Sequence, residues 1–315
     1  LIGFIDEAST LSIDKKILLV SHMELGKEHS DQKSILKYCR ENNIFSNKYE
    51  QVLLNAGLKP HSWNIKTPTE STFRSRSLLF FAAGIYIANK ISPQCQLIVP
   101  ENGTISINIP LDSGRRSSCS TRTTHPTFIK RIQEALYTIG ISNSIYNPYR
   151  LKSKADMVLE CCQDTSKKAI LKSLVDLSCS CAKRGHNVFW DKSGIEIRNA
   201  KIKHCGMCLP CLYRRVALDT IGLDNEALLG TDVLHGIKFN LDNKHQKRNR
   251  DFNALLYFLK NRMNERTIRQ ELFFNGIIEK QELDEYTSLA LHSYRQVINW
   301  LKKKATNEIQ IRAGI

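Results

Sequence analysis

Three cysteines in the second half of the chain are spaced so that they could bind a metal ion together. Cys205, Cys208 and Cys211 follow a C-x2-C-x2-C pattern, which places three sulfurs on one tight turn. Gly206 gives the backbone of this turn freedom, and Pro210 restricts it. Thiolates are soft donors, and four of them in a tetrahedral arrangement bind zinc in a closed structural site. The spacing therefore favours a zinc knuckle over a set of separate buried thiols.

The fourth sulfur must come from a distant part of the chain, where Cys179 and Cys181 are both candidates. Disulfides are the competing possibility, but ten cysteines in 315 residues are a modest number and nothing resembles a secretion signal. No apolar run reaches membrane-spanning length, since Leu78–Ala88, the most apolar stretch, is too short. We therefore expect a soluble, cytoplasmic protein without membrane contact. Because four thiolates leave no open coordination position, its zinc is expected to be structural.

A loop rich in hydroxyl groups is a second candidate for ligand binding. Ser120–Pro126 contains several hydroxyls, the guanidinium of Arg122 and the imidazole of His125, a set that suits an oxyanion or a polar heterocycle. The same residues could instead form a helix-capping loop, because Thr124 could cap a helix whose first turn holds Pro126. The local sequence leaves both interpretations open.

Alternating strand and helix patterns would place polar clusters at one edge of a sheet. Short apolar runs predict strands at 16–22, 61–65 and 96–100, and helical spacing predicts helices at 1–8, 30–39, 72–90 and 128–139. This order is typical of a three-layer α/β fold with a mainly parallel sheet. Ligands in such folds bind beyond the carboxyl ends of the strands. Ser21 and His22 lie at that end of the first strand, and Glu101 and Asn102 follow the last.

The chain carries a strong positive charge. Its formal net charge is +15, from 46 Lys and Arg against 31 Asp and Glu, and its 42% hydrophobic content is enough to fill a core. A positive surface attracts polyanions, which include nucleotide phosphates, nucleic acids and acidic proteins. Basic runs are more often solvated faces than binding sites, so charge alone leaves nucleic-acid binding as an alternative.

The last part of the chain is predicted to be helical. Apolar residues recur at helical spacing from 251 to 259 and again from 278 to 301, with charged residues between them. This pattern predicts an appendage of two to four helices. Docking of these helices onto the parent domain is favoured over a protein-binding surface.

Four segments occur in the order found in one enzyme family. They are Thr72–Ser77, Asn147–Met157, Asp176–Cys179 and His204–Cys211. Together they resemble the first helix turn, the lysine motif, the L-S-C segment and the zinc knuckle of the 7-cyano-7-deazaguanine synthases of the QueC family. Cys179 stands where this family has its first zinc ligand. The resemblance therefore implies that Cys179, rather than Cys181, completes the zinc site.

The resemblance also implies the PP-loop ATP pyrophosphatase fold, which is similar to that of the adenine nucleotide alpha hydrolases. The family's S-G-G-x-D-S signature, whose backbone amides hold the nucleotide phosphates, is not in the sequence. In the family it lies immediately before a helix like Leu1–Ala8. We therefore expect a PP-loop domain over 1–225 that lacks its N-terminal strand and signature loop, with the zinc knuckle over 179–211. A helical C-terminal region is expected over 226–315.

Several departures from the housekeeping enzymes point to one branch of the family. Their substrate loop is replaced by Ser120–Phe128, their G-R-N tripeptide by Ser75–Ser77, and about a hundred residues follow the knuckle. These features, together with Pro100–Gly103, resemble the QatC-like members, which belong to the Qat anti-phage defence system.

The resemblance implies an ATP-dependent carbon–nitrogen ligase that uses magnesium. Such enzymes adenylate a 7-deazaguanine carboxylate, and an amine, here of a Qat-system partner protein, then attacks it. By position, the nucleotide would contact Ser21, His22, Arg76 and Lys154, and the acceptor pocket would be lined by Glu101, Asn102, Arg122, Thr123, Thr124 and His125. The alternatives are a housekeeping 7-cyano-7-deazaguanine synthase of queuosine biosynthesis and a catalytically silent PP-loop scaffold that binds an acidic protein or a nucleic acid.

Overall fold

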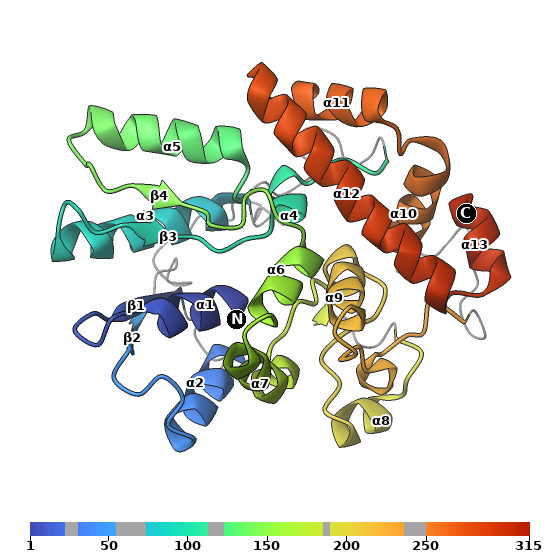
Figure 1. Ribbon diagram of the computed structural model, residues 1–315, viewed down its shortest axis with the longest axis horizontal. Coiled ribbons are helices and arrows are strands. Elements are labelled where there is room, and N and C mark those ends of the chain that lie inside the picture. Colours follow the sequence, from blue (N-terminus) through green and yellow to red (C-terminus); the bar gives the residue numbers. More distant parts are fainter. Residues whose placement is uncertain (23–30, 55–73, 113–122, 185–189, 236–249) are drawn as a thin grey trace, which may run out of the picture. The chain divides into compact units, whose positions relative to one another are not determined.

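The computed structural model describes residues 1–22, 31–54, 74–112, 123–184, 190–235 and 250–315, which form helices and parallel strands (Figure 1). The chain divides into two compact units. Unit 1 contains Leu1–Glu101, Thr121–Pro148 and Ser166–Ser178, and unit 2 contains Asn102–Ser120, Tyr149–Thr165 and Cys179–Ile315. Each unit is therefore assembled from three separate segments of the sequence.

Unit 1 combines helices with short strands. Its elements are α1 (Ile2–Thr10), β1 (Ile17–His22), α2 (Asp31–Glu41), β2 (Tyr49–Leu54), α3 (Arg74–Ile91), β3 (Leu97–Ile98), α5 (Pro126–Thr138), β4 (Ile145–Tyr146), α7 (Thr165–Leu174) and the 3-10 helix η3 (Val175–Leu177). The helices and strands expected at 1–8, 16–22, 30–39, 72–90, 96–100 and 128–139 are present with shifted ends. β2 was not expected, and the strand expected at 61–65 lies outside the described residues.

The strands form two parallel pairs. β1 pairs with β2 in a register that sets Ile17 opposite Tyr49, and β3 pairs with β4 through Leu97 and Ile145. The described strands do not form one continuous sheet, so the structure is mixed α/β with small parallel sheets. Parallel pairing requires a crossover between partners, and α2 and α5 supply helices for these crossovers.

α3 packs against one strand of each pair. It contacts β1 and β3, and Gly84 allows the close approach to β3 because a Cβ there would lie 2.7 Å from a methyl group of Leu97. Asn143 fixes the chain beyond this helix: its Nδ2 donates to the carbonyl oxygens of Ser92 and Cys95, both at 2.8 Å. These contacts hold the second strand pair against α3.

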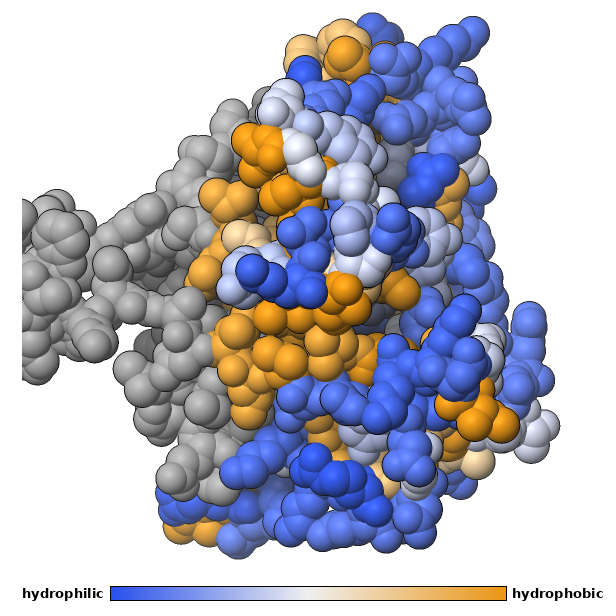
Figure 2. Space-filling model, turned by 90° about the vertical axis from the view of Figure 1, so that its left-hand side faces the viewer, coloured by the Kyte–Doolittle hydropathy of each residue, from blue (hydrophilic) through white to orange (hydrophobic). Residues whose placement is uncertain are grey.

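One face of the molecule carries uncovered apolar patches. Figure 2 shows orange patches among hydrophilic residues on the left-hand side of Figure 1, where α3 and α5 end. No described side chain of α5 is fully buried, and Ile91, Tyr137 and Ile139 are all more than half exposed. α5 is held by partly buried side chains such as Phe128, whose ring lies 5.8 Å from that of Phe81.

Unit 2 is helical in its described part. Its elements are α4 (Gly103–Ile107), α6 (Lys154–Cys161), α8 (Gly194–Asn199), α9 (Leu209–Asp219), the 3-10 helix η5 (Glu226–Leu228), α10 (Arg250–Asn261), α11 (Glu265–Phe274), α12 (Lys280–Lys304) and α13 (Asn307–Ala313). α12 contacts α4, α9, α11 and α13 (Figure 1). None of the helices in the described part of the chain is both long and apolar enough to cross a membrane.

The C-terminal helices share a hydrophobic core with the cysteines of the knuckle. Cys205 and Cys211 belong to the same buried cluster as Phe252 of α10 and Tyr294 and Trp300 of α12. The units therefore do not follow the boundary expected after residue 225. The apolar stripes of α10 and α12 are buried in this shared core.

Candidate metal centre

Four cysteine sulfurs of unit 2 lie close together. The Sγ atoms of Cys181, Cys205, Cys208 and Cys211 all lie within 4.8 Å of one another. Those of Cys205 and Cys211 are 3.8 Å apart, which excludes a disulfide bond between them. Zinc–sulfur bonds of about 2.3 Å in a tetrahedron separate neighbouring sulfurs by about 3.8 Å. The donor set and its spacing thus fit a tetrahedral ion such as zinc.

The fourth sulfur belongs to Cys181, not to Cys179 as the family resemblance implied. Residues 179–181 are hydrogen-bonded to residues 203–205. The register between these two segments determines which cysteine lies beside the sulfurs of the knuckle. The Sγ of Cys179 donates to the carbonyl oxygen of Lys203 at 3.6 Å, whereas the Sγ of Cys181 accepts the backbone N–H of Cys205 at 3.3 Å. Cys181 also accepts the backbone N–H of Lys183 at 3.3 Å. The Sγ of Cys179 is therefore not one of the four clustered sulfurs.

The knuckle turn is shaped by backbone hydrogen bonds to sulfur. The Sγ of Cys205 accepts the N–H groups of Met207 at 3.4 Å and Cys208 at 3.3 Å. Gly206 has a φ of +82°, and a Cβ there would lie 2.3 Å from the carbonyl oxygen of Thr231. Only glycine fits this position, because it accepts positive φ and leaves room for the facing backbone. The prediction that Gly206 provides the turn's freedom is thereby confirmed.

α9 begins inside the cluster. Cys208 is the N-cap of this helix, Pro210 lies in its first turn, and Cys211 follows. The N-terminus of a helix carries partial positive charge, which favours thiolates over thiols. The helix therefore positions two of the four sulfurs.

The four thiols shift one another's pKa in opposite directions. Hydrogen bonds, first with Cys181, lower the pKa of Cys205, while hydrogen bonds to the same neighbours and burial raise the pKa of Cys211. Four thiolates cannot coexist in so small a buried volume without a compensating charge. A divalent cation bound to all four sulfurs would provide that charge, and four sulfur ligands leave no open position for a substrate or water.

His204 precedes the knuckle but is outside the donor set. Its Nε2 accepts the backbone N–H of Ser180 at 3.3 Å. Burial and then the positive charge of Arg214 lower the pKa of His204 to about 3, and Lys203 and Arg184 act in the same direction. The ring is therefore neutral at physiological pH, which its role as a hydrogen-bond acceptor requires.

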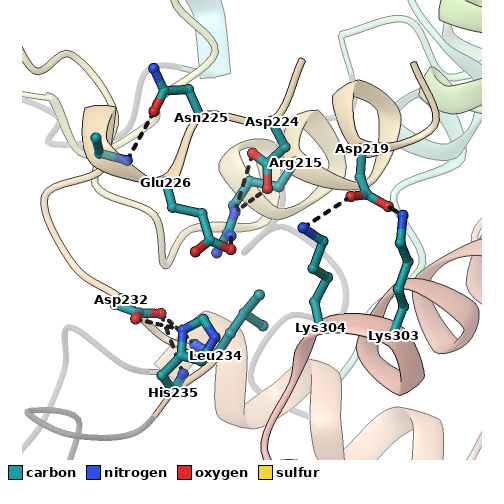
Figure 3. A network of polar contacts seen from close by, with 11 residues as sticks. Arg215, Asp219, Asp224, Asn225, Glu226, Asp232, Leu234, His235, Lys303 and Lys304 are labelled. Atoms are coloured by element: carbon teal, nitrogen blue, oxygen red, sulfur yellow. Dashed lines mark hydrogen bonds and ion pairs between the residues drawn. The ribbon is translucent and has the colours of Figure 1, made fainter. Parts of the chain in front are cut away.

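A buried arginine of α9 pairs with two carboxylates of the segment that follows this helix (Figure 3). Arg215 is 1% exposed; its Nε lies 3.1 Å from Asp224 and its Nη2 lies 2.7 Å from Glu226. Its guanidinium also stacks over the ring of Trp300 of α12, 5.1 Å from the centroid. Burial raises the pKa of Asp224, and the charge of Arg215 opposes this shift. Asp219, the last residue of α9, pairs with two lysines of α12, so α9 contacts α12 at two positions in its second half.

The residues expected at the nucleotide fall in both units. Ser21 is buried near the carboxyl end of β1, where its Oγ accepts a hydrogen bond from Gln51 at 3.4 Å. His22 ends the same strand and Arg76 lies in the first turn of α3, but their side chains lie outside the described part of the structure. Lys154 is the first residue of α6 in unit 2. Unit 1 thus contains three of the four predicted residues.

α6 starts with a capping box that α12 completes. Ser153 accepts the backbone N–H of Asp156, and the carboxylate of Asp156 accepts the backbone N–H of Ser153. His292 and Gln296 of α12 contact the Oδ1 of Asp156 at 2.9 Å and 2.7 Å. Burial would raise the pKa of Asp156, but these hydrogen bonds together outweigh it and lower the pKa. Sequence reasoning missed this role of α12, because no local pattern links residues so far apart.

The residues expected in the acceptor pocket are divided in the same way. Thr123, Thr124 and His125 lie in unit 1, where the latter two are buried, and Arg122 lies outside the described residues. His125, not Thr124, is the N-cap of α5. Glu101 ends a segment of unit 1 and its carbonyl oxygen accepts from Asn147 at 2.8 Å.

Asn102 begins the next segment, in unit 2. It is the N-cap of α4, and its Oδ1 accepts the N–H of Ile105 at 3.1 Å. The following Gly103 has no space for a side chain, since a Cβ would lie 2.1 Å from the carbonyl oxygen of Arg150. The described contacts give this pair a structural role in starting α4.

The sequence matches no protein-family model and no curated protein, and the structure matches no solved structure. Support for a function therefore comes from the residues and from the geometry of the two units.

Proposed function

We propose that this chain is an ATP-dependent enzyme of the QueC type, closest to the QatC-like branch, with a structural zinc site. The observation that carries the proposal is a contact within unit 1. The hydroxyl groups of Ser77 and Thr123 are 2.7 Å apart. Ser77 follows Arg76, which the resemblance assigns to the nucleotide, and Thr123 belongs to the loop assigned to the acceptor. The contact thus brings the two assigned segments together, as a group-transfer enzyme requires.

The strand arrangement of unit 1 also supports the proposal. Among the described strands, β1 and β3 each have a partner on one side only, and α3 contacts both. A further parallel strand would complete the sheet between them. Ser21 lies near the carboxyl end of β1, where ligands of such sheets bind.

The proposed reaction has two steps. A carboxylate oxygen of the deazaguanine acid attacks the α-phosphorus of ATP, which forms an acyl adenylate and releases pyrophosphate. An amine nitrogen then attacks the acyl carbon, the bond to AMP breaks, and the nitrogen loses a proton as the amide forms. Positive side chains would stabilise the charge on the phosphates, and magnesium would share this task.

The test uses the full-length protein with ATP, magnesium, a 7-deazaguanine carboxylic acid and the partner proteins of the defence system. We expect mass spectrometry to detect the adenylate and then a partner whose mass has increased by the acylated base. Arg76→Ala should weaken ATP binding about tenfold or more, since a charge-assisted hydrogen bond contributes roughly 1.5–3 kcal/mol. Arg122→Ala should reduce transfer to the partner.

Arg131→Ala is the matched control. Arg131 is an exposed residue of α5 that pairs with Glu134 at 2.9 Å, so its loss removes the same charge without touching the assigned segments. Release of free 7-cyano-7-deazaguanine from ammonia, with every partner unmodified, would favour the housekeeping synthase. Partner binding without ATP and without any product would favour the scaffold.

A further inference from the structure

The four cysteines of the metal centre differ in their access to solvent. Cys205 and Cys208 are 0% exposed and Cys211 is 1% exposed, and all three belong to the core that they share with α10–α13. Cys181 is partly exposed and packs against that core. A small molecule from solvent can therefore reach the cluster at Cys181 before it reaches the other three sulfurs.

Cys181 also has a close partner for a disulfide bond. Its Sγ lies within 4.8 Å of the other three sulfurs and accepts the backbone N–H of Cys205 at 3.3 Å. The sulfurs of Cys181 and Cys205 need to approach by less than about 3 Å to reach the S–S bond length of about 2.05 Å. Cys179 is partly exposed as well, but its Sγ is not one of the clustered sulfurs. Exposure and a neighbouring thiol thus coincide at Cys181.

We propose that the metal centre is a redox switch, in which a peroxide oxidises Cys181 and a disulfide with Cys205 then releases the bound metal. In the first step the sulfur of Cys181 attacks one oxygen of hydrogen peroxide, the O–O bond breaks, hydroxide leaves and a sulfenic acid forms. The sulfur of Cys205 then attacks that of Cys181, the S–O bond breaks and a second hydroxide leaves. Two protons from solvent convert both hydroxides to water. The two thiolates have then lost two electrons, and the peroxide has gained them.

Metal release follows because the sulfurs of a disulfide are no longer thiolates. Only Cys208 and Cys211 would remain as ligands, too few for the closed tetrahedral site that four sulfurs form. Metal binding energy is folding energy for such sites, and these cysteines share their core with α10–α13. Oxidation should therefore loosen the helices around the metal centre, and a reductant with added zinc should restore them. This inference rests on the metal centre and does not depend on the proposed ATP chemistry.

The test treats the zinc-loaded protein with hydrogen peroxide and follows free zinc with a colorimetric chelator. Cys181→His is the test variant, because a site of three cysteines and one histidine also binds zinc but cannot form a disulfide at this position. Cys179→Ser is the matched control, since it removes a partly exposed thiol from the same segment and leaves the four clustered sulfurs in place. It also makes Cys181 the only cysteine of the tryptic peptide Ser173–Lys183, so that mass spectrometry can assign its disulfide partner.

We expect the unmodified protein and Cys179→Ser to release about one zinc for each disulfide formed, with Ser173–Lys183 linked to the peptide His204–Arg214 through Cys205. Zinc release from Cys181→His should be about tenfold slower or more. Dimedone, which traps sulfenic acids, should label Cys181 of the unmodified protein ahead of the three buried cysteines, a measurement that holds even if Cys181→His binds no zinc. Release from zinc-loaded Cys181→His at the unmodified rate, first labelling of a buried cysteine, or zinc release without a disulfide would each overturn the proposal.

Discussion

Among single residues, the choice between two neighbouring cysteines is the most direct test of the metal centre. Cys181→Ser should lower bound zinc from about one per chain to near zero after dialysis against a weak chelator, because it leaves an incomplete tetrahedron. Cys179→Ser is the matched control and should keep its zinc, since the Sγ of Cys179 bonds to the carbonyl oxygen of Lys203. Elemental analysis of both variants measures the effect. Loss of zinc only from Cys179→Ser would reverse the assignment.

The cysteines of the metal centre were only partly predictable from the sequence. The spacing of Cys205, Cys208 and Cys211 was sufficient to predict the knuckle, because three sulfurs on one tight turn are typical of metal binding. Cys181 could not be chosen over Cys179 in the same way, because the choice depends on the register between two segments more than twenty residues apart. The family resemblance pointed to the wrong member of the pair.

At the scale of helices, the contact between α6 and α12 should make stability depend on pH. The pKa of Asp156 is lower in the folded protein than in the unfolded chain, where it is about 4. The ionised carboxylate therefore contributes its full stabilisation above pH 4, and this contribution is lost as the pH falls through the folded-state pKa. Asp156→Asn should cost about 1–2 kcal/mol at pH 7, and the difference from the unmodified protein should shrink below pH 4. Urea unfolding at several pH values measures this difference.

Zinc is released by acid from both the unmodified protein and Asp156→Asn. Its effect therefore cancels when the two unfolding free energies are subtracted. Asp284→Asn, at an exposed position of the same helix α12, is the control and should change the unfolding free energy by less than about 0.5 kcal/mol. If the difference in unfolding free energy between the unmodified protein and Asp156→Asn stays constant down to pH 3, the charge of the Asp156 carboxylate does not contribute to stability.

Most helices were predictable because their apolar periodicity is long and continuous. β2 was missed because Tyr49–Leu54 mixes polar and apolar residues and directly follows a basic segment. The four C-terminal helices agree with the two to four expected, yet their docking against the cysteine core was not readable from periodicity alone. Amphipathic patterns indicate that a face is buried but do not identify its partner.

For the whole molecule, zinc removal should affect the two units differently. The cysteines and α10–α13 share one core, so a strong chelator with a reductant should destabilise unit 2 as a whole. Hydrogen exchange followed by mass spectrometry should show faster exchange in 190–235 and 250–315, with little change in α1, β1 and β2 of unit 1. Added zinc should restore protection. Full protection of α10–α13 after zinc loss would instead show that these helices fold without the metal.

The shared core also sets an order of events during synthesis. Cys211 is made about one hundred residues before Ala313, although both belong to the same buried cluster. At roughly 5–20 residues per second, this separation lasts about 5–20 s on the ribosome. All four thiols of the cluster exist throughout that interval, while the helices that will cover them are still being made. Capture of zinc by the nascent chain would protect these thiols from oxidation until the last helix arrives.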